Sequence, residues 1–451
     1  MHEDTICAPA TAPVNSSLSI IRVSGPESYR AASCIFSLPE KIKHRIASYG
    51  SIVSGDEVID DVILVYYKSP SSFTGEDMIE ISCHGNPIIV SRIMKLLFSN
   101  GVRSALPGEF SKRAFLNGKM DLAEAEAINS LINARSDWEI KTSIEQMHGS
   151  LSRTVNNIRD DVILLKADLE AGIDFIDQDI EFVSYERGVE LSAEIKLKLA
   201  DFHERCIVGE KVSKGVDVIL AGRPNVGKSS LLNLILNEER AIVSDIPGTT
   251  RDLIRETIQV GGVRINLTDT AGIGVAGDDI EKIGIERTKR KIADASLVLA
   301  VIDGVAGVTD EDREILASFS DKKIIYVLNK VDLITGERVT ELRDETGYEF
   351  VPVSAKFGNG FRELENAISD VINSEFVDYN NSFLADTRIT GILSDSVLII
   401  ERVAGLFERK ELPEIIAFEL NELADRLSEI TGEISPDDVL GSIFSRFCIG
   451  K

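Results

Sequence analysis

The sequence of 451 residues lacks several features that mark particular classes of protein. Its five cysteines are scattered and form no Cys-x-x-Cys pair, a usage that favours a reducing, cytoplasmic environment over an oxidising one. The longest apolar runs, such as Leu297 to Ile302, are only as long as a strand, and the first residues show no basic-then-apolar signal region. We therefore expect no membrane insertion.

The chain also has few positively charged residues relative to its acidic ones. The chain has 49 Lys and Arg against 74 Asp and Glu, a formal net charge of −25, which argues against broad capture of nucleic acid by a basic face. Any RNA contact would then be local or shared with a partner, and the acidity itself is typical of cytosolic solubility. At about 150 residues per domain, the length suggests about three domains.

Among the features that are present, the segment Gly222 to Ser229 has the spacing of a phosphate-binding loop, G-x-x-x-x-G-K-S. The apolar run 216–221 predicts a strand before it, and the run 230–236 predicts a helix after it. In this order, backbone N–H groups and a helix N-terminus face a phosphate. Lys228 would add a positive charge, and Ser229 would bind Mg²⁺.

Three further motifs follow the loop in order, namely Asp269-Thr270-Ala271-Gly272, Asn329-Lys330-Val331-Asp332 and Ser354-Ala355-Lys356. Asp269 follows an apolar strand and would hold Mg²⁺ through water, while Gly272 could approach the terminal phosphate. The carboxylate of Asp332 can accept hydrogen bonds from guanine N1–H and N2–H₂, which adenine cannot offer. Each such bond to a charged group contributes about 1.5–3 kcal/mol. The ordered set predicts a guanine-nucleotide hydrolase.

The predicted nucleotide contacts in these four motifs are Asn225, Val226, Gly227, Lys228, Ser229, Ser230, Asp269, Thr270, Ala271, Gly272, Asn329, Lys330, Asp332, Ser354, Ala355 and Lys356. The residue after Gly272 is Ile273, where Ras-like enzymes place a water-orienting glutamine. A partner could supply the missing group, or an acid from the run 278–282 could orient water. The same acids are also typical of a solvated helix start, with Asp278 or Asp279 as the N-cap. Spacing alone leaves both readings open.

The remainder of the chain divides by pattern. Residues 1–118 mix strand patterns (18–23, 62–67 and 78–83) with a helical one (87–99), which predicts an α+β domain. Residues 211–375 alternate strand and helix patterns around the nucleotide motifs. This alternation predicts an α/β domain.

Residues 119–210 and 376–451 carry helical stripes, in which apolar residues step by three and four. The stripes are Leu122, Ala125, Ile128 and Ile132; Val155, Ile158, Val162, Leu165 and Leu169; and Ile416, Leu420, Leu423, Leu427 and Ile430. Neither half can bury its stripe alone. We therefore predict a multidomain chain in which one discontinuous all-α bundle is interrupted by an inserted α/β P-loop GTPase domain.

Motifs outside the nucleotide segment carry a family resemblance. They are the ending Cys448-Ile449-Gly450-Lys451, the segment 73–77 (Phe-Thr-Gly-Glu-Asp), and the segment 107–110 (Pro-Gly-Glu-Phe) followed by 113–119. With the GTPase motifs in the expected order, the whole chain resembles the MnmE (TrmE) family of tRNA-modification GTPases, of the TrmE-Era-EngA-YihA-Septin-like superfamily.

This resemblance implies that the chain helps to add a carboxymethylaminomethyl or aminomethyl group to C5 of the wobble uridine of certain tRNAs. It further implies a homodimer working with an MnmG-like flavoprotein, which carries FAD, in a heterotetramer or larger complex. The one-carbon unit would come from a tetrahydrofolate derivative, in the 5-formyl or methylene form, bound by the N-terminal domain, which also dimerises.

The matching positions imply roles for particular residues. Arg22, Glu80, Lys119 and Lys451 match the family's folate contacts. Without the resemblance, Arg22 could be a surface strand residue, Glu80 a cross-strand ion pair and Lys119 a helix-start cation. Cys448 invites a nucleophilic role, although a lone cysteine is more often a buried hydrophobe.

In the nucleotide domain, the resemblance implies activation by pairing of two such domains, with K⁺ supplying the charge that an arginine finger brings elsewhere. The implied K⁺ ligands are Asn225, Ser244, Ile246 and Thr249, and the second Mg²⁺ ligand is Thr250. The whole segment Ser244, Asp245, Ile246, Pro247, Gly248, Thr249 and Thr250 would contact the nucleotide. Glu281 matches the water-orienting glutamate and is the predicted catalytic residue.

A second function class remains open, a GTP-driven switch or scaffold in ribosome assembly without modification chemistry. Such factors commonly append a basic RNA-binding module, whereas residues 376–451 are acidic and amphipathic. The modification hypothesis is therefore favoured.

Overall fold

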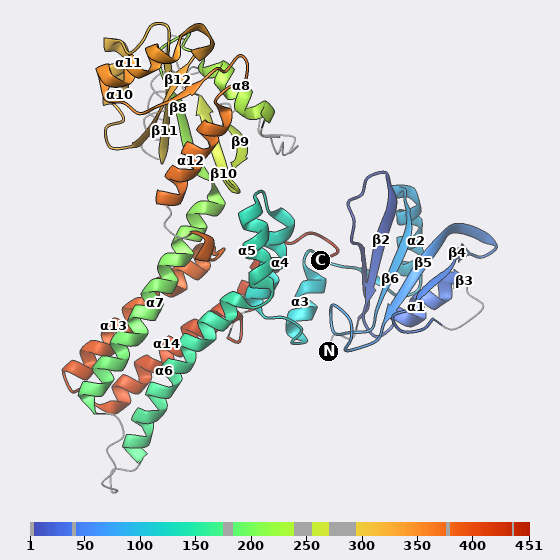
Figure 1. Ribbon diagram of the computed structural model, residues 1–451. Helices are drawn as coiled ribbons and strands as arrows, with labels where there is room; N and C mark the ends of the chain where they lie inside the picture. Colours follow the sequence, from blue (N-terminus) through green and yellow to red (C-terminus); the bar gives the residue numbers. More distant parts are fainter. Residues whose placement is uncertain are drawn as a thin grey trace, which may run out of the picture. The chain divides into compact units, whose positions relative to one another are not determined.

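The computed structural model describes residues 4–37, 42–174, 184–238, 255–269, 295–375, 379–434 and 437–451 (Figure 1). They form two compact units, one of Met1–Asn129, Gln146–Ile195 and Leu398–Lys451, the other of Ser130–Glu145 and Lys196–Val397. These two units divide the chain at other residues than the predicted limits 1–118, 119–210, 211–375 and 376–451. The predicted limits therefore stay a prediction. Within the described ranges, no helix has the length and apolar character needed to cross a membrane.

The first unit contains a seven-stranded sheet. Its order is β3 (Phe36–Ser37), β4 (Ala47–Ser54), β5 (Glu57–Tyr67), β6 (Met78–Gly85), β2 (Ser16–Ser24), β1 (Ile6–Pro9) and β7 (Arg103–Ser104). Only the β1–β7 pair within this sheet is parallel. Helices α1 (Ser28–Ile35) and α2 (Pro87–Ser99) bury their apolar faces against it. The predicted strands and the helix 87–99 are confirmed.

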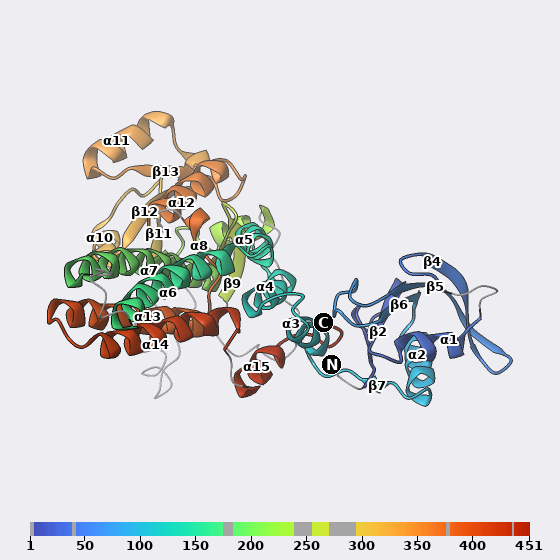
Figure 2. The same ribbon diagram turned by 90° about the horizontal axis from the view of Figure 1, so that it is seen from below.

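Further helices in the described residues are α3 (Glu109–Leu116), α4 (Leu122–Asn133), α5 (Asp137–Met147), α6 (Ser150–Asp174), α7 (Tyr185–Lys214), α13 (Thr387–Glu408), α14 (Pro413–Thr431) and α15 (Asp437–Phe444). The predicted stripes of α6 and α14 are buried along their whole length, and these two helices pack together (Figure 2). Segments before and after the nucleotide-binding segment thus share one core, as the discontinuous bundle requires.

The predicted stripe of α4 was wrong at its end. Leu122 and Ala125 are fully buried, but Ile132 is 44% exposed. The first turns of α4 pack against Phe444 and Phe447 around α15. Residues 130–133 of α4 group with the second unit, so the cluster around α15 buries the beginning of the helix and does not extend to Ile132.

The second unit contains a six-stranded sheet in the order β13 (Phe350–Val353), β12 (Lys323–Asn329), β11 (Leu297–Asp303), β8 (Val216–Ala221), β10 (Val263–Asp269) and β9 (Arg255–Val260). Its strands are parallel except for β9, which pairs with β10 in the antiparallel sense. Parallel strands covered on both faces read as continuous apolar runs. This coverage explains why residues 216–221 and 324–328 are mostly apolar.

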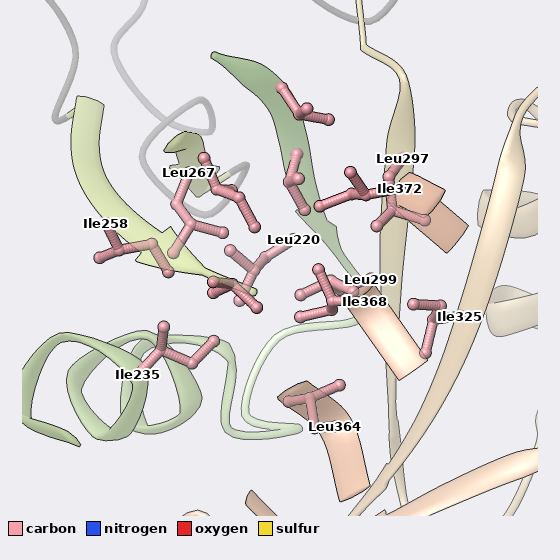
Figure 3. Packing of buried hydrophobic residues seen from close by; sticks show 14 of the residues in the cluster. Leu220, Ile235, Ile258, Leu267, Leu297, Leu299, Ile325, Leu364, Ile368 and Ile372 are labelled. Carbon is pink, nitrogen blue, oxygen red and sulfur yellow. The ribbon is translucent and has the colours of Figure 1, made fainter. Parts of the chain in front are cut away.

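Helices cover both faces of this sheet. Leu231 and Ile235 of α8 (Lys228–Glu238) and Leu364, Ile368 and Ile372 of α12 (Phe361–Glu375) share one core (Figure 3). Helices α10 (Asp310–Ala317) and α11 (Gly336–Thr346) pack on the opposite side through smaller clusters. The phosphate-binding loop therefore leaves a rigid strand and enters a helix anchored in the main core.

Helix α5 belongs to this second unit through Trp138, the sole tryptophan of the sequence. The Trp138 ring is 5% exposed. Its indole N–H donates to the carbonyl oxygen of Tyr379 at 3.0 Å, and its backbone N–H donates to that of Gly262, in the β9–β10 turn, at 3.1 Å. These contacts hold α5 against the hairpin.

Candidate functional site

The phosphate-binding loop adopts backbone angles that require glycine. Gly222 and Gly227 have φ of 148° and 99°. A Cβ atom on Gly222 would lie 2.4 Å from the carbonyl oxygen of Val301, and one on Gly227 would lie 2.2 Å from Asn329 Nδ2. Neither position can take a side chain without moving the loop.

Lys228 is held inside this loop. Its Nζ donates to the carbonyl oxygens of Gly222 at 2.6 Å and Arg223 at 2.8 Å. Ser229 and Ser230 follow in the first turn of α8, and both are exposed. A cation beside a helix N-terminus with exposed hydroxyls suits a phosphate group and a hard cation such as Mg²⁺.

Asn329 joins three of the predicted motifs. Its side chain is 2% exposed, and its Nδ2 donates to the carbonyl oxygen of Val226 in the phosphate-binding loop at 2.8 Å. Its Oδ1 accepts from the backbone N–H of Ala355 at 3.1 Å. The loop and the Ser354-Ala355-Lys356 motif are therefore fixed on one buried amide.

Lys330 makes a second link to the loop. It has φ of 64°, and its Nζ donates to the carbonyl oxygen of Asn225 at 2.9 Å and to Asp303 Oδ2 at 2.6 Å. Burial alone would raise the pKa of Asp303, but the hydrogen bonds from Lys330 and from the N–H groups of Val305 and Ala306 outweigh it and lower the pKa. Asp303 is therefore an anionic partner for the lysine.

Asp332 faces a cavity of about 680 Å³ beside the loop, in the part of the chain that the structure describes. The Ser354 hydroxyl donates to Asp332 Oδ1 at 2.7 Å. The Lys356 ammonium lies 5.0 Å from the centre of the Phe357 ring. The cavity lining is Gly227, Ser230, Asn233, Leu234, Asn329, Lys330, Asp332, Leu333, Ala355, Lys356, Phe357 and Gly358.

A second cluster lies on the sheet of the first unit. Arg22 and Glu80 are register partners on β2 and β6, with Arg22 Nε donating to Glu80 Oε1 at 2.9 Å. The Tyr67 hydroxyl donates to Glu80 Oε2 at 3.3 Å, and the Arg22 guanidinium lies 5.5 Å from the centre of the Phe73 ring. The cross-strand ion pair is therefore real, and it lies within a larger polar cluster.

The C-terminal residues complete this cluster. Arg22 Nη1 donates to the carbonyl oxygen of Gly450 at 3.5 Å, and a Cβ atom on Gly450 would lie 2.2 Å from the carbonyl oxygen of Pro9. Burial, reinforced by the charge of Arg22, lowers the pKa of Lys451. Two cations and a carboxylate thus lie together, a donor set that fits an anionic ligand with N–H groups.

Lys119 lies at the neighbouring turn, where its Nζ donates to the carbonyl oxygen of Pro70 at 3.1 Å. The structure therefore brings Arg22, Glu80 and Lys451 together and places Lys119 against the loop that carries Phe73. Cys448 is exposed, so its interpretation as a buried hydrophobe was wrong.

The loop next to this cluster is braced by a buried arginine. Arg113 is fully buried and pairs with Asp4 at 2.8 Å, Glu109 at 2.9 Å and Glu76 at 3.2 Å. Glu76 Oε2 also accepts from the Ser24 hydroxyl at 2.8 Å. This network fixes the 73–77 motif against β2.

Comparisons with known proteins cover the whole chain. A family model described as the MnmE helical domain matches residues 122–448, and one described as GTP-binding protein TrmE N-terminus matches residues 5–119. The chain is 41% identical over 450 residues to the tRNA modification GTPase MnmE of Aquifex aeolicus, covering 99% of this chain and 100% of that one. The chain belongs to the MnmE family of tRNA modification GTPases.

Other MnmE proteins are similarly close. The protein from Dechloromonas aromatica is 40% identical over 456 residues, and that from Acetivibrio thermocellus is 38% identical over 457 residues. The alignments cover 100% of this chain in both cases, with 100% and 99% of the respective relatives.

Several predicted site residues of this MnmE-family chain lie outside the described residues. They are Ser244, Asp245, Ile246, Pro247, Gly248, Thr249, Thr250, Thr270, Ala271, Gly272 and Glu281. Asp269 ends β10 beside β8, with Leu220 as its register partner. Its backbone therefore ends next to the strand that leads into the phosphate-binding loop.

Sequence reasoning missed several residues of the candidate nucleotide site. Asp303, Asn233, Leu333 and Phe357 contact or line it. Asp303 carried a usable signal, because it follows the apolar run 297–302 as Asp269 follows its own strand. The other three reach the site only through the folding of η2 (Val331–Leu333), α8 and the loop after β13.

Proposed function

We propose that this chain is a K⁺-dependent GTPase that, with an MnmG-like flavoprotein, modifies C5 of the wobble uridine of certain tRNAs, using a folate one-carbon unit. The observation that carries this proposal is the approach of Gly450 and Lys451 to the Arg22–Glu80 pair. A GTPase that acted only as a switch would not need a C-terminal segment docked into a polar cluster on its first unit.

In the nucleotide site, Lys228 and the N-terminus of α8 bind the phosphates, and Asp332, oriented by Ser354, reads the guanine edge. Ser229 and Thr250 would bind Mg²⁺, which neutralises charge on the phosphates. Asn225, Ser244, Ile246 and Thr249 would hold K⁺, which supplies positive charge in the transition state. Glu281 orients the attacking water.

In the first unit, Glu80 accepts hydrogen bonds from N–H groups of a reduced pterin, and Arg22 and Lys451 bind the ligand's anionic groups. Lys119 adds a further cation at the rim of the neighbouring turn. The ligand would be a tetrahydrofolate derivative in the 5-formyl or methylene form, which supplies the one-carbon unit.

The proposed working form is a cytoplasmic homodimer in a heterotetramer or larger complex with the flavoprotein, which alone carries FAD. The two nucleotide domains pair across the bound nucleotides. Hydrolysis then changes the relation between paired domains, which gates the folate-dependent step on the tRNA.

The test is mass analysis of wobble uridines from cells that lack this protein and from rescued cells. Wild type should restore the modified nucleoside, whereas Glu80→Ala should not, because the ligand loses its acceptor. Glu57→Ala is the matched control, since Glu57 is an exposed carboxylate on the same sheet, paired to Arg92 at 2.5 Å. Normal wobble uridines in the deletion strain would contradict the modification function and favour the switch or scaffold.

A further inference from the structure

Two carboxylates delimit the segment from the end of β11 to the first turn of α10, and each is connected to a different part of the phosphate-binding loop. Asp312 Oδ1 accepts from Arg223 Nε at 2.9 Å. Asp303 Oδ2 accepts from Lys330 Nζ, which also donates to the carbonyl oxygen of Asn225. We call residues 303–312 the anchor segment.

The Asp312 contact is rigid because both oxygens of the carboxylate accept hydrogen bonds. Its side chain is 2% exposed, and that of Arg223 is 18% exposed. Asp312 Oδ2 accepts from the Thr309 backbone N–H at 3.0 Å and from its hydroxyl at 2.9 Å, closing the capping box of α10. The carbonyl oxygen of Arg223 in turn accepts from Lys228. Asp312 therefore fixes the residue that holds the phosphate-binding lysine.

The Asp303 contact is fixed in a similar way. Its Oδ1 accepts from the backbone N–H of Val305 at 2.9 Å, so the Oδ2 that contacts Lys330 has little freedom. Asn225, whose carbonyl oxygen accepts the other hydrogen bond from Lys330, has φ of 65°. This left-handed conformation costs energy in a residue other than glycine. Lys330 stabilises that conformation by binding the carbonyl oxygen of Asn225.

We propose that the anchor segment positions the phosphate-binding loop at two points, with Asp303 and Asp312 as positioning residues for nucleotide retention. Asp303 acts on Asn225 through Lys330, and Asp312 acts on the start of the loop through Arg223. Since Asn225 is a proposed K⁺ ligand, Asp303 also sets the K⁺ concentration needed for activation. This last step rests on the proposed function.

The two anchors have different expected effects. In Asp303→Asn, Lys330 loses its ionic partner, and the loop spends more time in conformations that do not bind phosphate. A hydrogen bond to a charged group is worth enough to speed GDP release by roughly tenfold, and the K⁺ concentration for half-maximal turnover should rise. Asp312→Asn should also speed release, with a smaller effect on K⁺, because Arg223 precedes the proposed ion ligand.

The experiment measures release of a fluorescent GDP analogue, turnover against K⁺ concentration, and the thermal unfolding midpoint, all with the full chain. The variants are Asp303→Asn, Asp303→Glu, Asp312→Asn and Arg223→Lys. Asp303→Glu keeps the charge and should restore part of the retention. Arg223→Lys removes the Nε donor without leaving a buried carboxylate free of positive charge, so it tests the Asp312 anchor even if Asp312→Asn does not fold. Glu341→Gln, which removes an exposed ion pair to Arg338 on α11, is the matched control.

Wild-type release rates in folded Asp303→Asn and Arg223→Lys would overturn the proposal, as would a lowered unfolding midpoint with unchanged release and K⁺ dependence. Failure of the proposed K⁺ activation is a separate result. It would show as wild-type turnover that does not respond to K⁺, while faster release from Asp303→Asn would still support the anchor.

Discussion

The hydroxyl of Ser354 donates a hydrogen bond to Asp332 Oδ1 at 2.7 Å, so a buried serine after β13 orients the carboxylate that follows β12. The two residues are 22 positions apart in the chain. The proposed base recognition by Asp332 therefore depends on the packing of two neighbouring strands as well as on the motif itself.

We expect Asp332→Asn to weaken guanine-nucleotide binding by about 10-fold to 100-fold, because hydrogen bonds to a charged acceptor are lost. The same variant should gain affinity for xanthine nucleotides, since the new amide can donate to the additional carbonyl of that base. Fluorescent GDP and XDP analogues measure both. Ser354→Ala should keep the guanine preference with a smaller loss, and unchanged GDP affinity in Asp332→Asn would contradict the assignment.

Gly227→Ala should abolish nucleotide binding, because the added Cβ would lie 2.2 Å from Asn329 Nδ2 at a residue with φ of 99°. Gly391→Ala on α13 is the control, since nothing lies within 4 Å of its Cβ position. In a helix interior this change should stabilise by about 0.5–1 kcal/mol. Equilibrium nucleotide binding and equilibrium unfolding, measured for both variants, distinguish the loss of binding from a change in stability. Normal nucleotide binding by Gly227→Ala would be incompatible with the described loop.

Turnover should rise with K⁺ and respond little to Na⁺ at equal ionic strength, because a coordination site replaces a particular hydration shell. Asn225→Ala should lose most of this stimulation while still binding GDP, and the exposed Asn366→Ala on α12 should behave as wild type. Phosphate release in the two salts is the measurement. Equal rates in both would remove the K⁺ proposal.

Glu281→Ala should lower the maximal turnover and leave nucleotide affinity unchanged, because a water-orienting group acts in the transition state. Asp278→Ala, which tests the helix-cap reading of the same acidic run, should retain turnover. Steady-state kinetics with separate binding measurements distinguish them. Loss of affinity with unchanged turnover in Glu281→Ala would exclude the catalytic role.

Glu109→Gln should destabilise the first unit in a pH-dependent manner. Burial alone would raise the pKa of Glu109, but hydrogen bonds from Arg103, the Leu106 N–H and Arg113 lower it from 4.5 to about 2. Because the folded pKa is depressed, the stabilisation is present above the unfolded value and is lost as pH falls from about 4.5 towards 2. A shift of this size corresponds to about 3 kcal/mol at neutral pH.

Urea unfolding at several pH values tests this expectation. The difference in unfolding free energy between wild type and Glu109→Gln should shrink as the pH is lowered through that range. A difference that stays constant with pH would show that the carboxylate's charge contributes nothing and that the variant acts by packing alone.

The local chemistry of the motifs could be predicted from the order of residues along the chain. The phosphate-binding loop needs glycine at Gly222 and Gly227 for backbone reasons. This loop and Asp269 each follow a strand that an apolar run already predicted. The stripes of α6 and α14 were also predictable, because helical periodicity names the buried face without naming its partner.

The contacts that join distant segments could be known only from the fold. The hydrogen bond between Arg22 and Gly450 joins residues 428 positions apart, and that between Arg223 and Asp312 joins residues 89 positions apart. No sequence pattern at these residues indicates the partner. Periodicity also failed at Ile132, which lies outside the apolar cluster that buries the beginning of α4. Spacing along the chain specifies each residue's local geometry, whereas the partner of a buried charge depends on how strands and helices pack, and here that packing brings the carboxyl-terminal residues and the anchor segment to their sites.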